Sequence, residues 1–254
     1  MTTVHKPDSA LPVFTESGET GACWSCGDMR AAHFCQACGR LQPALPTDYF
    51  SFFALPRKLN LDTAALERDF YNLSRKLHPD IYVRATDQER AWSLEKSSQL
   101  NDAYRTLKDP ISRTQYLLKL EGVQLEEQSK AATEKAKQKG EPKQQVVPPG
   151  LLEEVFELNL QLEELRRSKK MGEADPAVVA DLQKAKSHLE EKYGGLDAEL
   201  KGYWEQWDAL MEREAREAVP LEERHRVRDR MVDLLNRRSY IRNLVRDVNE
   251  ALED

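Results

Sequence analysis

Apolar residues recur at steps of three and four along most of this chain of 254 residues, which is the spacing of one face of an amphipathic helix. One such run consists of Leu66, Phe70, Leu73 and Leu77. Asp62 before the run is a good N-cap, because its carboxylate can accept hydrogen bonds from the first free amides of a helix. Pro79 cannot continue a helix and disfavours helical conformation at His78. The pattern therefore predicts one helix that ends near Leu77.

A second helix is predicted over residues 88–107, and a third over residues 111–120 after Pro110. The inward face of the second helix is expected to consist of Leu94, Leu100, Tyr104 and Leu107. Two amphipathic helices joined by a short connection pack as an antiparallel hairpin. We therefore expect the tripeptide His78-Pro79-Asp80 to be exposed to solvent at the tip of a hairpin.

The carboxyl-terminal part predicts helices over residues 151–170 and 177–216, and a last helix after Pro220. The apolar positions of the last helix are Val227, Met231, Leu234, Ile241, Val245, Val248 and Leu252. The pair Gly194-Gly195 is expected to interrupt or kink the middle helix, because glycine has a poor helix propensity. Three long amphipathic helices pack as a small antiparallel bundle. The predicted fold class is therefore all-α, with a helical hairpin followed by a three-helix bundle.

Changes in composition divide the chain into five segments. Residues 1–20 are polar without periodicity and are expected to form a disordered tail. Residues 21–46 contain all four cysteines, and residues 47–122 carry the hairpin, preceded by a short aromatic turn of helix. Residues 123–149 are rich in Lys, Gln, Ala and Glu with three prolines, which favours a linker. Residues 150–254 hold the bundle.

The charge of the chain restricts the classes of partner. The formal net charge is −6, whereas a general nucleic-acid-binding protein usually has a basic surface. No apolar run approaches the length that a membrane span requires, and the first residues resemble neither a signal peptide nor a mitochondrial presequence. We therefore expect a cytoplasmic protein, as in a bacterium. In a eukaryotic host, a cleaved or atypical targeting segment would be needed for the alternative location, the mitochondrial matrix.

The four cysteines form two CxxC pairs, Cys23 with Cys26 and Cys35 with Cys38. Two such pairs suit a tetrahedral Zn²⁺, because four thiolates close its coordination sphere. Gly27 and Gly39 follow the second cysteine of each pair and supply the backbone freedom that such turns need. A closed four-sulfur site favours a structural zinc ion that stabilises a segment too small for its own core. Iron or a redox role is the alternative interpretation.

The tripeptide could also belong to an enzyme, with His78 as a general base oriented by Asp80. No nucleophile, phosphate-binding loop or oxyanion donor lies near it in the sequence, so an enzyme is disfavoured. An ordinary loop that ends a helix is a further alternative, since Pro and Asp are common in turns. Arg75 and Lys76, directly before the tripeptide, favour a basic docking surface instead.

Residues 49–122 resemble a J-domain, whose defining mark is a His-Pro-Asp loop after a basic helix. The sequence LNDAYRTLKDPISRTQYLLKLEG at residues 100–122, with DYF at residues 48–50, is similar to the HscB/Jac branch of co-chaperones. The pattern CWSCG…FCQACGRLQP resembles the zinc-binding extension of some members of that branch. The resemblance implies a J-domain that docks a DnaK-type chaperone and triggers its ATP hydrolysis.

The resemblance also implies the residues of two binding sites. The chaperone-binding set is His78, Pro79, Asp80, Arg68, Arg75 and Lys76. By similarity of LLEEVFELNLQLEEL to the first helix of the family's bundle, Leu152, Phe156, Glu157 and Glu164 bind the scaffold protein IscU. Tyr240 on the last helix matches an aromatic position of the same surface. Two positions depart from the family pattern: Glu153 stands where an apolar residue is usual, and Leu160 stands where a carboxylate is usual. Leu158, Leu162 and Leu165 are expected to face the interior of the bundle.

The resulting hypothesis is a co-chaperone, not an enzyme, that delivers an IscU-type iron–sulfur scaffold to a DnaK/HscA-type chaperone and stimulates its ATPase. It would thereby assist iron–sulfur cluster assembly and transfer, with no nucleic acid and no membrane among its partners. Two alternatives remain: a general J-domain co-chaperone for unfolded clients, and a zinc-dependent interaction protein.

Overall fold

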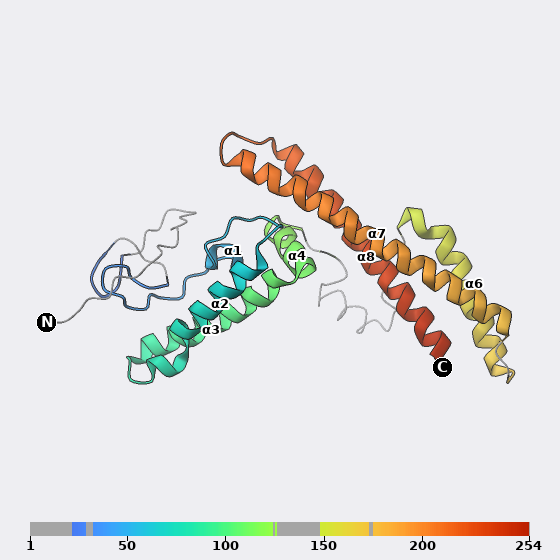
Figure 1. The fold of residues 1–254 in the computed structure, drawn as a ribbon, viewed down its shortest axis with the longest axis horizontal. Coiled ribbons are helices and arrows are strands. Elements are labelled where there is room, and N and C mark those ends of the chain that lie inside the picture. The colour runs from blue at the N-terminus through green and yellow to red at the C-terminus, as the bar shows by residue number, and fades with distance from the viewer. Residues whose placement is uncertain (1–21, 29–32, 124, 126–147, 173–174, 254) are drawn as a thin grey trace. The chain divides into compact units, whose positions relative to one another are not determined.

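The computed structural model describes residues 22–28, 33–123, 125, 148–172 and 175–253 (Figure 1). The chain divides into two compact units between Tyr116 and Leu117. The described residues are helical or irregular, apart from one isolated bridge between Phe34 and Leu41. None of the described helices is both long enough and apolar enough to cross a membrane.

The first unit contains two helices whose beginnings are capped by aspartates. Helix α1 spans Tyr49–Phe52, and the Asp48 carboxylate accepts hydrogen bonds from the amides of Phe50 and Ser51. Helix α2 spans Thr63–Leu77, and Asp62 caps it by accepting from the amides of Ala64 and Ala65. Both the N-cap and the end at Leu77 agree with the predictions from the sequence.

Helix α3 spans Asp87–Lys108 and lies beside α2, as the hairpin predicts (Figure 1). The core between them consists mainly of Leu66, Leu73, Leu77, Leu100, Ala103 and Leu107. Phe70 adds to it by stacking on Tyr104, with ring centroids 4.1 Å apart. The prediction for Leu94 is wrong, because its side chain is 64% exposed. Ser93 is buried on this side of α3 instead, and its hydroxyl donates a hydrogen bond to the carbonyl oxygen at the end of α2.

Helix α4 spans Pro110–Leu120 and is followed by Gly122, whose φ of 79° suits a residue without a side chain. Its start belongs to the first unit, where Tyr116 stacks on Tyr49 with centroids 4.4 Å apart. The Tyr116 hydroxyl also accepts a hydrogen bond of 3.0 Å from the Tyr49 amide. Helix α1 is thereby attached to the helix that follows the hairpin.

The second unit holds three long helices, all in mutual contact. A short 3₁₀ turn, η3 over Pro149–Leu151, leads into α6 over Leu152–Lys170. Helices α7 over Pro176–Glu214 and α8 over Leu221–Glu253 run side by side (Figure 1). Their buried face includes Leu182, Leu189, Leu196, Leu200, Met231, Leu234, Ile241 and Val248. The predicted three-helix arrangement is confirmed.

Helix α7 continues through Gly194 and Gly195, so the expected interruption is wrong. Each glycine costs about 1 kcal/mol relative to alanine inside a helix. Leu189 before the pair and Leu196 after it are both buried, and burying one leucine side chain contributes about 1.5–3 kcal/mol. Packing on the neighbouring helices therefore outweighs the low propensity of the pair.

Two sequence predictions fall outside the described residues. These are the tail over residues 1–20 and most of the linker over residues 123–149.

Candidate functional site

The tripeptide His78-Pro79-Asp80 lies at the tip of the α2–α3 hairpin. His78 leaves the helix with φ −58° and ψ 131°, and Pro79–Tyr82 form the 3₁₀ turn η1. Nδ1 of His78 accepts a hydrogen bond of 3.3 Å from the Asp80 amide, so a neutral ring carries its proton on Nε2. The side chains of His78 and Asp80 are 55% and 85% exposed. The tip therefore presents an imidazole and a carboxylate to solvent, as expected.

Side chains of α3 hold the last turn of α2 just before the tip. The hydroxyls of Ser93 and Ser97 both donate to the carbonyl oxygen of Leu77, at 2.7 and 2.9 Å. Their hydrogen bonds satisfy a carbonyl group that the end of a helix leaves without a partner. The Tyr82 hydroxyl donates to the carbonyl oxygen of Lys76 at 3.1 Å. The backbone on both sides of the tripeptide is thus fixed from within the hairpin.

The predicted basic residues of α2 are all on its exposed side. Arg75 and Lys76 occupy the last turn, next to His78, and Arg68 lies about two turns earlier. Cations in a last turn also interact favourably with the negative end of the helix dipole. Sequence reasoning missed the apolar residues Ile81 and Val83, which are exposed beside the tip. A 3₁₀ turn gives them no helical periodicity that would mark them.

The four cysteines converge, as their spacing predicts. Their sulfur atoms all lie within 4.8 Å of one another, with Cys23 and Cys38 3.7 Å apart and Cys26 and Cys35 3.6 Å apart. A tetrahedral ion with bonds of about 2.3 Å to sulfur separates its ligands by about 3.8 Å. The four sulfurs therefore fit a metal ion of this kind.

The two CxxC pairs form matching turns. The Gly27 amide donates to the Cys23 carbonyl and the Gly39 amide to the Cys35 carbonyl, both at 2.8 Å. Both glycines have positive φ, 76° and 71°, which residues with a side chain rarely adopt. In each pair the first cysteine is buried and the second is exposed. Their expected role in the turns is supported by these angles.

Hydrogen bonds favour the thiolate form of Cys23. Burial raises the pKa of its thiol, but the amides of Cys26 and Ser25 and the side chain of Gln42 donate to the sulfur and lower the pKa to about 6. The Gln42 amide nitrogen lies 3.3 Å from the sulfur and the Ser25 amide 3.4 Å. Since metals bind the thiolate, these donors favour a cation at this position.

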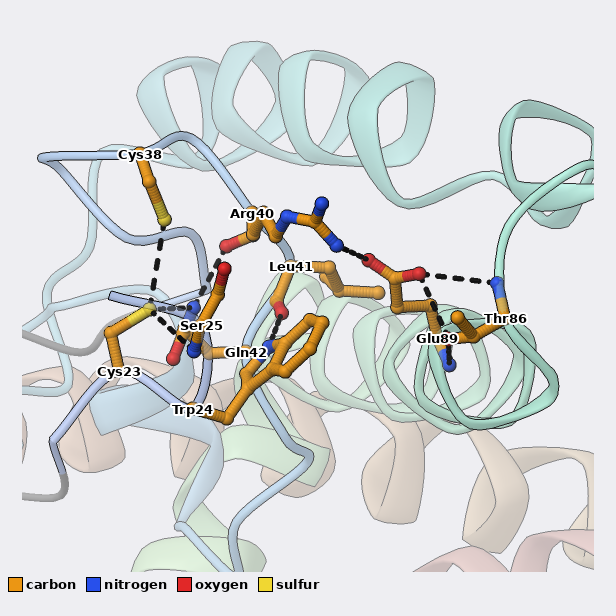
Figure 2. A network of polar contacts seen from close by, with 9 residues as sticks. All are labelled: Cys23, Trp24, Ser25, Cys38, Arg40, Leu41, Gln42, Thr86 and Glu89. Carbon is orange, nitrogen blue, oxygen red and sulfur yellow. Dashed lines mark hydrogen bonds and ion pairs between the residues drawn. The ribbon is translucent and has the colours of Figure 1, made fainter. Parts of the chain in front are cut away.

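The cysteine segment, residues 22–28 and 33–42, packs against the first turns of α3 (Figure 2). A guanidinium nitrogen of Arg40 lies 3.5 Å from a carboxylate oxygen of Glu89. The rings of Trp24 and Trp92 meet edge to face, with centroids 5.7 Å apart. The Trp24 ring nitrogen donates to the Leu41 carbonyl at 2.7 Å. Both ends of the segment are thus in contact with one helix.

His33 makes a third connection to the hairpin. Its Nε2 lies 2.8 Å from the Phe52 carbonyl oxygen, and its Nδ1 lies 3.4 Å from Nζ of Lys96. The pKa of His33 is lowered to about 4 by burial and by the charge of Lys96. The ring is therefore neutral near pH 7, donating from Nε2 and accepting at Nδ1. No sequence motif indicated this residue.

The exposed side of α6 carries an apolar stripe. Leu152, Phe156 and Leu160 follow one another at steps of four and are 56%, 68% and 53% exposed. The predicted acidic residues Glu157 and Glu164 are exposed, and so is Glu153. The prediction that Leu158, Leu162 and Leu165 face inward is confirmed by their burial. Leu160 lengthens the apolar stripe by one turn.

Tyr240 does not belong to this exposed stripe. Its side chain is only 8% exposed on α8, and burial raises the pKa of its hydroxyl. An aromatic residue with so little accessible surface packs the bundle and offers little to a partner. The expectation that Tyr240 adds an aromatic contact to the surface of α6 is therefore corrected.

One comparison matches the hairpin, and the others match more than half of the chain. The family model described as the DnaJ domain matches residues 48–116. An Arabidopsis thaliana protein named iron–sulfur cluster co-chaperone protein HscB homolog is 32% identical over 176 residues, which are 68% of this chain and 60% of the relative. A Vibrio vulnificus protein named co-chaperone protein HscB homolog is 34% identical over 143 residues, 56% of this chain and 75% of the relative.

The match to the human relative, named iron–sulfur cluster co-chaperone protein HscB, covers 64% of that protein at 33% identity. This chain thus spans somewhat less than two thirds of the Arabidopsis and human relatives. The crystal structure of human co-chaperone protein HscB has the same fold, with a TM-score of 0.58 at 24% sequence identity, over 91% of this chain and 98% of that one.

Proposed function

The chain belongs to the HscB family of co-chaperones, and from this membership we propose that it delivers an IscU-type iron–sulfur scaffold to a DnaK/HscA-type chaperone and stimulates the chaperone's ATPase. The observation that carries the proposal is the exposed His78-Pro79-Asp80 tip inside the residues that match the DnaJ domain. In this role the chain is no enzyme itself; the chaperone hydrolyses the ATP.

The chaperone side of the proposal uses the tip and the basic side of α2. Arg68, Arg75 and Lys76 would attract an acidic surface, and the tripeptide would engage the chaperone's catalytic machinery. Charges at the rim of an interface mainly raise the association rate and fix orientation. Loss of one of these cations should therefore weaken stimulation partly, whereas loss of the tip should abolish it.

The scaffold side uses the exposed stripe of α6. Leu152 and Phe156 expose apolar surface that a monomeric helix normally buries, and Glu157 and Glu164 are exposed on the same helix. We include Leu160 in this surface because it continues the same stripe. The scaffold would contribute an apolar patch bordered by basic residues.

The cysteine site is proposed to hold zinc in a structural role. Four sulfurs at tetrahedral spacing leave no open coordination position for a substrate. Binding of Zn²⁺ would contribute about 10 kcal/mol or more to ordering such a segment. Anaerobic purification followed by elemental analysis tests the assignment: one zinc per chain is expected, and iron at that stoichiometry would contradict it.

The main test replaces His78 by Gln in an ATPase assay with the chaperone and the scaffold. His78→Gln should abolish stimulation and leave the circular dichroism and unfolding midpoint unchanged, because the side chain is exposed. His188→Gln is a matched control, since it makes the same substitution at an exposed position of α7. Full stimulation by His78→Gln would refute the proposed mechanism. Equal affinity for an extended peptide and the folded scaffold would instead indicate a general co-chaperone.

A further inference from the structure

Helix α3 makes two different connections from its first three turns. One face carries Ser93 and Ser97, which donate to the last carbonyl of α2. A neighbouring face carries Glu89, Trp92 and Lys96, each of which contacts the cysteine segment. The start of α3 thus lies between the metal-binding residues and the backbone that supports the tripeptide.

Glu89 joins the cysteine segment to the first turn of α3 (Figure 2). Its carboxylate accepts from the Thr86 amide at 3.1 Å, while the Thr86 hydroxyl accepts from the Glu89 amide at 3.2 Å. This reciprocal capping box fixes the first turn of α3. The same carboxylate lies 3.5 Å from Arg40. Arg40 therefore contacts Glu89, which forms the capping box of α3 with Thr86. Helix α3 is the helix that follows the tripeptide and the turn η1.

The cysteine turns place Trp24 and Arg40, two of the residues of the segment that contact this end of α3. Trp24 lies between Cys23 and Cys26, and the Arg40 carbonyl accepts a hydrogen bond of 2.9 Å from the Cys35 amide. The guanidinium of Arg40 also lies over the Trp24 ring, 5.3 Å from its centroid. A metal ion that closes the two turns would fix Trp24 and Arg40 together. Without it, the segment has few buried apolar residues to keep its shape.

We propose that the metal-bound cysteine segment positions the start of α3, with Arg40 and Trp24 as positioning residues, and thereby orders the turn that carries His78-Pro79-Asp80. The expected consequence, tighter binding of the chaperone, rests on the proposed function. The coupling itself is a property of the isolated chain. Arg40 is 51% exposed and Glu89 10%, so their ion pair alone contributes little, and the aromatic contact should carry much of the effect.

The test is amide hydrogen exchange of the full chain, measured with bound zinc and after removal of zinc by a chelator. Loss of a helix cap corresponds to about a fivefold to tenfold change in local opening. We expect exchange over residues 79–90 to rise by about that factor on chelation, while residues 100–107 of α3 stay protected. No change over residues 79–90, or an equal rise along all of α3, would overturn the proposal.

Variants separate the contacts from the metal itself. Trp24→Ala combined with Arg40→Gln should raise exchange over residues 79–90 even with zinc bound, and chelation should then add less than twofold. The matched controls are Gln36→Ala, which occupies the position of Trp24 in the second turn, and Arg105→Gln, an exposed arginine at the far end of α3. If the double variant loses zinc, Trp92→Ala is used instead, because it removes the same ring contact from the side of α3 and leaves the cysteine segment unchanged. A full response to chelation in the variants would contradict the proposed contacts.

The ATPase assay distinguishes positioning from docking. The double variant should raise the concentration for half-maximal stimulation severalfold and keep the maximal rate, whereas His78→Gln should lose the maximal rate. A lower maximal rate in the double variant would place these residues in the docking machinery and overturn their positioning role. If His78→Gln stimulates fully, the proposed function fails, yet the exchange result still decides the coupling.

Discussion

The hydroxyl of Ser93 on α3 donates a hydrogen bond of 2.7 Å to the carbonyl oxygen of Leu77, the last residue of α2. Ser97, one turn further, donates to the same oxygen. An amphipathic pattern would place apolar residues on the inward face of α3, but here two hydroxyls cap the neighbouring helix. The residue before the tripeptide is thereby tied to the helix after it.

The first prediction concerns these two serines. Ser93→Ala combined with Ser97→Ala leaves the Leu77 carbonyl without its partners, and an unpaired buried polar group costs about 1–3 kcal/mol. We expect the free energy of unfolding, measured in urea, to fall by that amount. Ser98→Ala on the exposed side of α3 should change it by less than about 0.5 kcal/mol. Equal effects of the two replacements would show that the hydrogen bonds do not stabilise the hairpin.

The second prediction separates the exposed aromatic residue of α6 from the buried one of α8. Phe156→Ala should weaken binding of the scaffold in calorimetry and change the stability by less than about 0.5 kcal/mol, because Phe156 is exposed. Tyr240→Ala should lower the stability by about 3–5 kcal/mol, because it leaves a cavity in the bundle. Unchanged affinity for Phe156→Ala would remove this surface from the proposed function.

The third prediction is a pH dependence caused by Lys96. Burial lowers the pKa of its amine to about 8, whereas in the unfolded chain it is about 10.4. Between these two values the unfolded chain binds more protons than the folded one, so the free energy of unfolding rises with pH. Lys96→Met removes this contribution to the pH dependence of the free energy of unfolding. Its stability relative to the natural chain should therefore fall by about 2 kcal/mol from pH 7.5 to pH 10.

Chemical unfolding of the zinc-loaded proteins across this range measures the difference. Lys119→Met is the control, because it makes the same substitution at an exposed position of α4. A difference between Lys96→Met and the natural chain that stays constant with pH would mean that the folded chain does not disfavour the charged amine.

The fourth prediction concerns Arg224, which lies over the ring of Trp207 and pairs with Glu121 and Glu214. The Nε of Arg224 donates to Glu121 at 2.9 Å, and the Glu121 side chain is almost buried. Glu121→Gln removes one charge of a desolvated pair and should lower the free energy of unfolding by about 1–3 kcal/mol. Glu205→Gln, at an exposed position of α7, should have little effect. A loss that disappears in high salt would indicate an ordinary surface pair.

Much of the fold could be predicted because local rules and packing agree. Asp62 caps α2 and Pro79 ends it, as the residue types require. The burial of Leu94 and the interruption at Gly194-Gly195 were predicted wrongly, because tertiary packing outweighs periodicity and propensity there. Next to Leu94, a serine donates a hydrogen bond to a backbone carbonyl. On either side of the glycine pair, buried leucines stabilise the helix by packing.

The candidate sites were predictable to different degrees. Two CxxC pairs bring their sulfurs together through short local turns, so the cluster follows from spacing alone. The contacts of Arg40 and Trp24 with α3 join residues about fifty to seventy positions apart, and no motif indicates them. One local signal was present: Thr86 followed three residues later by Glu89 is a capping-box sequence. The burial of Tyr240 depends on the neighbouring helices, which a similarity of sequence does not reveal.

The alternation of buried and exposed cysteines gives the four-sulfur cluster an inner and an outer half. Cys23 and Cys35 are buried, and Cys26 and Cys38 are exposed. A chelator or an electrophile would therefore reach the second cysteine of each pair first, and a metal ion would leave by losing those two ligands before the others. The lifetime of an ion bound there would then depend mainly on two of its four bonds, so we expect changes at Cys26 or Cys38 to alter how fast it exchanges.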